Sequence, residues 1–312
     1  MKFPTASTPL RMARRLAYRN FAIGSRLRYL AYSRSRDRTK QPLLVYQMGK
    51  VGSSTVVNSL SRYPLDYEVF QVHFLGRDWI RKVQKQFREA SRVHGRFIAD
   101  EHLFASEYLR NQMDRGSRDG RWKIITLIRD PIARNISGFF QAFPIYFAAE
   151  AAELEKEEAP MEEQMPRLVD LFVNKFQRHE VPLEWFDVHL EPQFGIDVYS
   201  RPFPTGDGYQ RFENDNAELL LLRLEDLDRC GPRAIGEFLG IPDFQLLNAN
   251  VGDEKEYSSA YSRFRKEIRL TADYVDRMHD SKFMKHFYSG EERRALRDKW
   301  LRADPVGAGD AS

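Results

Sequence analysis

The stretch WKIITLI, residues 122–128, followed by Arg129-Asp130-Pro131, decides the fold class of this chain. Its apolar and β-branched side chains run almost without interruption, which is typical of a strand buried on both faces. Asp130 suits the cap of a following helix and Pro131 suits its first turn, so we expect a helix from Ile132 to about Phe140. A buried strand that leads directly into a helix favours a parallel sheet covered by helices.

Similar runs predict the other elements. Strands are expected at 42–47, 68–73 and 219–224, and a shorter one beginning at 96–98. Helices are expected at 53–60, 78–92 and 234–239. The sequence therefore predicts a three-layer α/β fold with a mostly parallel central sheet and helices on both faces.

The pattern changes between residues 144 and 216. Residues 150–163 hold seven glutamates against one lysine, and 185–209 is aromatic and rich in loops. We interpret 144–216 as an insertion at the carboxyl edge of the sheet, where ligands bind in open α/β folds, and hence as a substrate cap. Its aromatics could stack on sugar rings or form a small core of the cap. The expected organisation is a basic tail or helix at 1–40, an α/β domain at 41–302 and a tail at 303–312.

Composition narrows the class of protein. The chain has 312 residues, of which 42% are hydrophobic, enough for a sizeable core. No run approaches the roughly 18 apolar residues of a membrane-spanning helix. Cys230 is the sole cysteine, which excludes an intrachain disulfide and a cysteine zinc cluster. The beginning of the chain shows no apolar core of a secretory signal, so we expect a cytoplasmic protein.

The net charge of +4 hides an asymmetry, because residues 1–40 hold eleven Lys and Arg against the single acid Asp37. The apolar residues of this segment are loosely spaced as in a helix: Leu16, Phe21, Ile23, Leu27 and Leu30. One interpretation is peripheral contact with a membrane through a basic interfacial helix. The other is a solvated or docked helix. No DNA-binding motif accompanies the charge, so no nucleic-acid partner is expected.

The first candidate site is the segment Gln47–Thr55, which reads QMGKVGSST between a predicted strand and a predicted helix. Glycines permit a tight turn and a close backbone approach, and a helix N-terminus favours an anion. Lys50 adds a positive charge. The segment is not a Walker A motif, because its lysine precedes the second glycine, Gly52, rather than following it. A plain surface turn with an exposed lysine remains the alternative.

The second candidate site follows the strand 122–128. Arg129 stands at the carboxyl end of that strand, and Ser137 lies about two helical turns further on. A guanidinium and a hydroxyl beside a helix N-terminus suit a phosphate. The alternative is an arginine that only bridges to Asp130.

Together these motifs resemble the sulfotransferases that use 3′-phosphoadenosine 5′-phosphosulfate (PAPS). Their 5′-phosphosulfate loop, Lys-x-Gly-[Ser/Thr]-[Ser/Thr], is matched by Lys50, Gly52, Ser53 and Ser54, with Thr55 beyond, and their 3′-phosphate motif by Arg129 and Ser137. LLLRLEDL at 220–227 and FLGI at 238–241 resemble the late strand and helix of the family. The chain most resembles bacterial sulfotransferase-like proteins labelled as capsular polysaccharide synthesis proteins, and KFMKHFY at 282–288 with Glu291 and Trp300 adds weakly to this.

The resemblance implies a P-loop-type sheet and in-line transfer of a sulfuryl group from PAPS to a hydroxyl of a carbohydrate or polysaccharide, leaving PAP. Lys50 would stabilise the leaving 5′-phosphate, and residues 51–55 (Val51, Gly52, Ser53, Ser54 and Thr55) would hold the phosphosulfate. No metal is expected, since a sulfuryl group carries less charge than a phosphoryl group.

His73, at the end of a predicted strand, is the first choice for the base that activates the acceptor, and a satisfied structural histidine is its alternative. Glu101 or His102, beside Asp100, comes second. His189, interpreted as a surface residue, comes third.

Other charged residues have plainer interpretations. Arg223 and Glu225 are expected to orient neighbouring loops, and Lys255 to be a surface lysine, although it falls where the family often binds the 3′-phosphate. Two rival functions stay open. One is a P-loop-type nucleotide or sugar kinase, and the other is a non-catalytic adaptor on a nucleotide-binding fold.

Overall fold

β3 (Trp122–Ile128) is the central strand of a five-stranded sheet with the order β2-β1-β3-β5-β4 in this computed structural model. Its neighbours are β1 (Gln41–Tyr46) and β5 (Ala217–Arg223), and the edges are β2 (Tyr67–Val72) and β4 (Tyr209–Glu213). All pairs are parallel except β4 with β5. The predicted mixed α/β fold with a mostly parallel sheet is confirmed.

The structure describes residues 20–116, 120–147, 149–150, 153, 161–247 and 258–301. Residues 1–19 of the basic segment, most of the acidic run 150–163, Lys255 and the tail 303–312 therefore lie outside the described residues.

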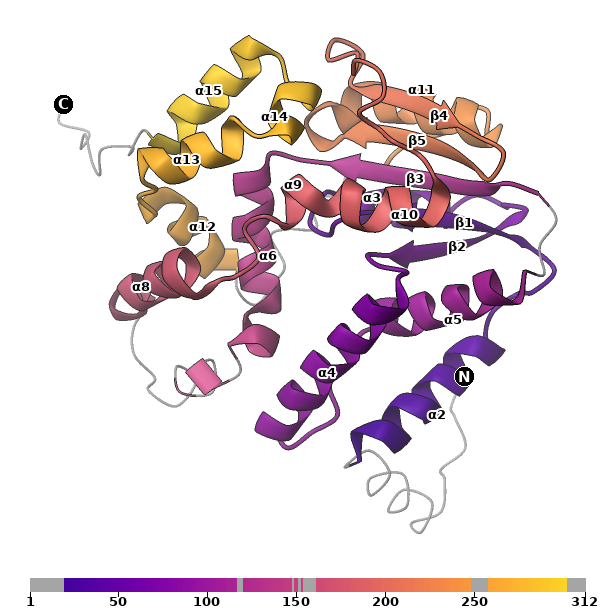
Figure 1. The fold of residues 1–312 in the computed structure, drawn as a ribbon, viewed down its shortest axis with the longest axis horizontal. Helices are drawn as coiled ribbons and strands as arrows, with labels where there is room; N and C mark the ends of the chain where they lie inside the picture. The colour runs from indigo at the N-terminus through magenta and orange to yellow at the C-terminus, as the bar shows by residue number, and fades with distance from the viewer. Residues whose placement is uncertain are drawn as a thin grey trace.

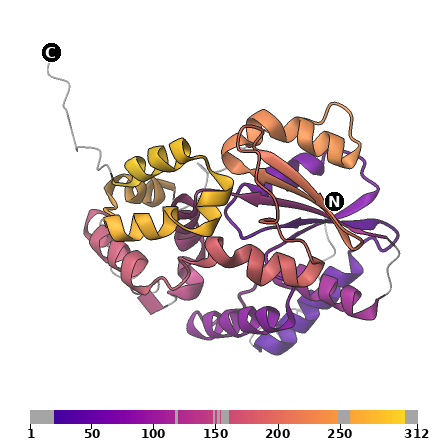
Figure 2. The same ribbon diagram turned by 45° about the horizontal axis from the view of Figure 1, so that its top comes forward.

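Helices cover both faces of the sheet (Figures 1 and 2). On one face lie α3 (Ser53–Leu60) and α11 (Leu227–Leu239), and the segment after α11 is bound to α3 where Leu247 N donates to Ser59 Oγ over 2.8 Å. On the other face, α5 (Glu101–Arg115) stacks Tyr108 on Phe70 of β2. α4 (Arg77–Val93) and α2 (Phe21–Arg34) extend this second layer.

The expected strand at 96–98 is wrong. The Ser91 hydroxyl, in the last turn of α4, accepts from the Ile98 N–H (2.9 Å) and donates to the Ile98 carbonyl (3.2 Å). These local bonds satisfy the backbone without a sheet neighbour, so the segment is a connector between α4 and α5.

The segment before β5 belongs to the main core. α9 (Val181–Trp185), a π-helical turn η2 (Phe186–Leu190) and α10 (Glu191–Phe194) form one continuous rod across the sheet. Trp185 and Phe194 pack edge-on against Tyr46 of β1, with ring centroids 4.8 and 5.9 Å away. The chain then returns as the edge strand β4, which the sequence pattern did not reveal because only Phe212 of its five side chains is buried.

The remaining helices form a second core around α6 (Pro131–Tyr146). Phe139 of α6 is its centre, and its ring lies within 5.3–5.9 Å of six other phenylalanine rings. The contributing elements are α8 (Met161–Asp170), the π-helical turn η1 (Leu171–Lys175), α12 (Ser258–Glu267), α13 (Ala272–His279) and α15 (Gly290–Leu301). α14 (Lys282–Phe287) joins this group to the sheet core. No helix in the described ranges is long and apolar enough to cross a membrane.

We predict that Phe194→Ala lowers the free energy of unfolding by about 3–5 kcal/mol, because its ring is fully enclosed between Tyr46 and Trp122. Urea unfolding measures the change. Val188→Ala, at a side chain of the same rod that is 38% exposed, is the control and is expected to cost less than about 1 kcal/mol. Equal small losses would mean that the rod is not part of the sheet core.

Candidate functional site

The β1–α3 loop, residues 47–52, has an unusual backbone. Gly49, Lys50 and Gly52 all lie in the left-handed region, with φ of 81°, 64° and 83°. Among the described residues only Lys50 and Asp243 adopt a positive φ without being glycine. Such a conformation costs of order 1–3 kcal/mol and persists only where the surroundings impose it. Gly52 caps α3 without a side-chain hydrogen bond. The Thr55 N–H donates to the Gly52 carbonyl over 3.1 Å, whereas the N–H groups of Ser53 and Ser54 have no acceptor within the helix.

Two arginines after β3 hold the loop from one side. Arg134, buried in the first turns of α6, donates from Nη2 to the Met48 carbonyl (2.7 Å) and from Nε to the Gly49 carbonyl (3.3 Å). Arg129 donates from Nη1 to the Lys50 carbonyl (3.2 Å). The carbonyl groups of three consecutive loop residues are therefore bound by guanidinium groups, which also bring positive charge to this end of the sheet.

Gln47 holds the loop from the other side. Its buried amide accepts from Gly49 N–H at Oε1 and donates from Nε2 to Ser53 Oγ over 2.9 Å. The sequence analysis gave Arg134 no role in the site, and it included Gln47 in the loop segment without assigning its side chain a role. Signals for both existed, because Gln47 is a polar residue ending an apolar run and Arg134 stands one helical turn after Asp130.

The side chain of Lys50 passes along α6. A Cβ added to Gly138 would lie 4.0 Å from Lys50 Cγ, so the stem of the lysine passes along this helix. Ser137, half-buried, is the preceding residue. The structure thus brings Arg129 to the backbone of Lys50 and places the lysine stem beside Gly138, the residue after Ser137.

The other predicted loop residues differ in accessibility. Ser54 is exposed and Thr55 half-buried, whereas the Val51 side chain is buried in the core, so Val51 offers only its backbone. The buried Ser53 hydroxyl accepts from Gln47 and, over 2.7 Å, from Gln71. The hydroxyl of Ser53 can therefore still donate one hydrogen bond through its own hydrogen.

His73 lies beside the loop at the end of β2. A Cβ on Gly49 would be 3.7 Å from His73 Cε1. Nδ1 of His73 is 3.0 Å from the Gln47 carbonyl, which can only accept, so we assign the proton to Nδ1 and the lone pair to Nε2. The Gln47 Nε2 atom also lies 3.1 Å from Nδ1, and the assignment follows the shorter contact with the backbone carbonyl.

The surroundings of His73 keep it neutral. Burial lowers its pKa well below 6.5, and the nearby His102, Arg134 and Arg178 lower it further, against the effect of its bond to Gln47. The His102 ring stands 4.3 Å away and is anchored by Nδ1 to the Gln71 carbonyl over 2.9 Å. Both histidines are therefore near the loop.

The remaining base candidates lie elsewhere. Asp100 caps α5 by accepting from Leu103 N over 3.0 Å. Glu101 is exposed and close enough to Tyr32 of α2 for its charge to raise the pKa of that phenol, although burial is the larger cause. His189 is not a surface residue as predicted, because it is buried between the rings of Trp79 and Trp185, and burial lowers its pKa to about 4.

Asp130 ties the C-terminal helices to the site. Its carboxylate is buried, accepts from the Ile132 N–H at the start of α6 (3.1 Å), and accepts from Trp300 Nε1 (2.7 Å). His279 Nε2 lies 3.3 Å from the same carboxylate. The Asp130 N–H in turn donates to Glu225 after β5 over 2.9 Å. The ends of β3 and β5 are thus held by α13 and α15.

Arg223 has the structural role that we expected. It is 3% exposed, bonds Asp226 from Nε (2.5 Å), and pairs with Glu292 of α15 over 2.8 Å. It also donates to the Phe287 and Thr205 carbonyls. Its guanidinium is therefore committed to the loops around β5. No group of three His, Cys, Asp or Glu in the described part of the chain could hold a metal ion.

Comparison with known proteins gives one match. Residues 160–289 match the NKWYS family, whose description reads "Putative capsular polysaccharide synthesis protein". No curated protein and no solved structure matches the chain. The matched segment is less than half of the chain and runs from α8 to the end of α14. It links the protein to capsular polysaccharide synthesis, and it begins after both the β1–α3 loop and Arg129.

We predict that Arg134→Met destabilises the protein by about 3 kcal/mol, because two loop carbonyls lose a charged donor. Thermal unfolding measures the loss. Arg233→Met, at an exposed arginine of α11, is the control and should change stability by less than about 0.5 kcal/mol. An unchanged stability in Arg134→Met would show that the guanidinium does not hold the loop.

Proposed function

We propose that the protein is a PAPS-dependent sulfotransferase that transfers a sulfuryl group to a hydroxyl of a carbohydrate or polysaccharide, on a P-loop-type sheet. The observation that carries this proposal is the left-handed backbone of Gly49, Lys50 and Gly52 at the start of α3. Turns that contain left-handed residues can bring successive N–H groups together in an anion-binding concavity, and a helix N-terminus strengthens it. The match to a capsular polysaccharide synthesis family supports a carbohydrate acceptor.

The residues of the site fit a phosphosulfate. Lys50 brings an ammonium group, Ser54 brings an exposed hydroxyl, and the N–H groups of Ser53 and Ser54 begin α3 without acceptors in the helix. Arg129 holds the loop through the Lys50 carbonyl, and together with Ser137 of α6 it would bind a second phosphate. PAPS supplies the activated S–O bond that is broken.

The chain's own residues would handle the proton and the charge. His73 Nε2, which bears the lone pair, would accept the proton of the acceptor hydroxyl while the acceptor oxygen bonds to sulfur. The bond from sulfur to the 5′-phosphate oxygen would break at the same time. Lys50 would stabilise the negative charge that this oxygen acquires, and PAP would leave.

Ligand binding tests the proposal directly. PAP at about a hundred times its Kd should stabilise the protein by ~2.7 kcal/mol and raise the Tm by roughly 4–6 °C. ADP and 5′-AMP, without added metal, are the comparison ligands, since neither has a 3′-phosphate. An equal rise with ADP would favour the kinase, and no rise with any of them would favour the non-catalytic adaptor.

Variants separate binding from transfer. Lys50→Ala should abolish transfer while PAP binding stays measurable, because the charge it stabilises develops mainly during transfer. Lys40→Ala is the control, since this lysine bonds the Leu65 carbonyl at the opposite end of β1. Normal turnover by Lys50→Ala would remove this lysine from the mechanism.

The pH dependence tests His73. A base acts in its neutral form, and His73 has a pKa well below 6.5, so it is neutral at neutral pH and becomes protonated only as the pH falls through that lowered value. We therefore expect kcat/KM to be flat between pH 6.5 and 8 and to fall only in more acidic solution.

His73→Asn should lower kcat by about 10²–10⁴-fold and abolish the acidic limb. His102→Asn is the matched variant, because its ring is the neighbour of His73. If His102→Asn produces the larger loss, His102 is the base.

A further inference from the structure

Helix α2 is docked on one side only. Asn111 of α5 donates to the Tyr29 hydroxyl over 2.8 Å, and Tyr32 packs edge-on against Tyr108 at 6.1 Å. The opposite side of α2 exposes Ile23, Leu27 and Leu30, which are 48%, 43% and 39% accessible. Their spacing of four and three residues places them in one stripe along the helix. We call these three side chains the α2 stripe.

The stripe is unusual for this molecule. Of six large apolar side chains that are exposed in the described ranges, three lie here, and the others are single valines: Val93, Val173 and Val188. Scattered single residues are normal on a protein surface, whereas a contiguous row marks an interaction site.

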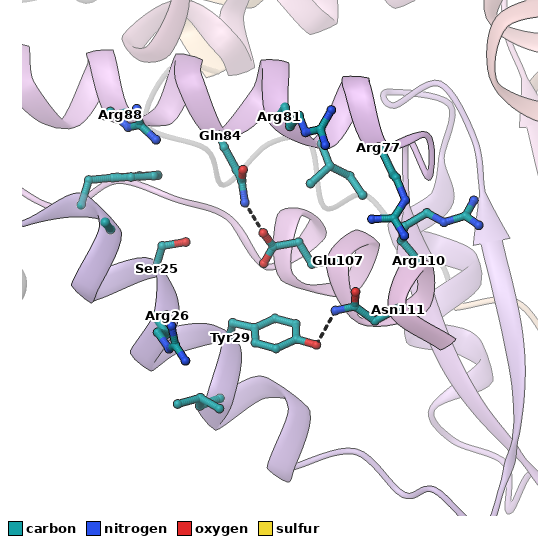
Figure 3. Close-up of a pocket in the computed structure, with 14 residues that line it drawn as sticks. Ser25, Arg26, Tyr29, Arg77, Arg81, Gln84, Arg88, Glu107, Arg110 and Asn111 are labelled. Atoms are coloured by element: carbon teal, nitrogen blue, oxygen red, sulfur yellow. Dashed lines mark hydrogen bonds between the residues drawn. The ribbon is translucent and has the colours of Figure 1, made fainter. Parts of the chain in front are cut away.

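A basic groove lies along α2 (Figure 3). It lies between α2, α4 and α5, has a volume of about 530 Å³, and is lined by five arginines: Arg26, Arg77, Arg81, Arg88 and Arg110. Leu30 of the stripe also lines it. The apolar and the basic features are therefore parts of one surface.

Acidic side chains neutralise only part of the positive charge of the groove. Arg77 and Arg110 share the single carboxylate Asp114, and Arg81 bonds Asp78 over 3.2 Å. The one acid of the lining is Glu107, which accepts from Gln84 and whose pKa is raised by burial. α2 itself contains no acid. The surface is thus strongly positive next to its apolar stripe.

We propose that the α2 stripe and the arginine groove are a docking surface for an anionic lipid bilayer. Apolar side chains would enter the interfacial region, and the arginines would bind lipid phosphates. A soluble polyanion would not bury the three exposed aliphatic side chains. A second copy docked stripe to stripe would bring two sets of arginines together. Charge complementarity therefore selects the bilayer, and this inference does not depend on the transfer chemistry.

The experiment measures binding of the full chain to vesicles by sedimentation. Phosphatidylcholine vesicles that contain phosphatidylglycerol should bind the protein, and pure phosphatidylcholine vesicles should not. Binding should weaken as salt rises, since exposed charges are screened. Equal binding to the two kinds of vesicle would overturn the proposal.

Two variants test the two parts of the surface. Ile23→Ser/Leu27→Ser/Leu30→Ser should weaken binding at least tenfold, and Val173→Ser/Val188→Ser is its control with exposed apolar residues elsewhere. Arg26→Gln/Arg88→Gln should weaken binding by about fivefold for each arginine removed. Its control is Arg233→Gln/Arg294→Gln, which removes the same charge from exposed sites on α11 and α15. Unchanged circular dichroism and Tm show that each variant is folded.

Other results assign the surface differently and overturn the proposal. Suppose that dextran sulfate binds the wild type and the triple serine variant equally well, and that the variant also binds vesicles like the wild type. The groove would then be a site for soluble polyanions. A dimer in light scattering that the triple serine change converts to a monomer would make the stripe a contact between copies of the chain.

Discussion

The hydrogen bonds from Arg134 to the carbonyl groups of Met48 and Gly49 are the constraint on which the candidate site depends. They fix a loop of β1 to the helix that follows β3, so two segments more than eighty residues apart in sequence act as one. A lysine with a positive φ is unfavourable by itself. It persists here because the neighbouring carbonyls are bound by Arg134 and Arg129 and because the Gln47 amide fixes Gly49.

α6 transmits this constraint to the rest of the molecule. Its first turn is held by the Asp130 carboxylate, which the C-terminal helices bind through Trp300 and His279. Its second half carries Phe139 at the centre of the helical core. α6 therefore connects the end of β3 to the helical core, and the site lies at the first turns of this helix. The segment that matches the capsular polysaccharide family supplies part of both cores.

In the basic segment, one face of α2 is docked on the protein and the opposite face is exposed. The docked-helix interpretation is correct for 21–34, because Tyr29 and Tyr32 attach α2 to α5. The same helix keeps Ile23, Leu27 and Leu30 at the surface beside arginines from two other helices. Arg77, Arg88 and Arg110 are ordinary charged residues in the sequence, and only the packing of α4 on α5 gathers them opposite α2.

Local chemistry in the sequence by itself determined the strands of the parallel sheet, the helix after Asp130-Pro131, and the loop containing Lys50 and Gly52. Apolar runs, a capping acid and glycines determine the backbone conformation of the residues next to them. The sequence alone therefore predicts these elements, without knowledge of their tertiary contacts. Only the tertiary structure decided that β4 is an edge strand, that Trp185 and Phe194 belong to the sheet core, and that His189 is buried. It also decided that His73 and His102 stand together beside the loop, and that Arg134 holds it. These depend on contacts between segments distant in the chain, and burial and pKa are set by those contacts rather than by the residue type.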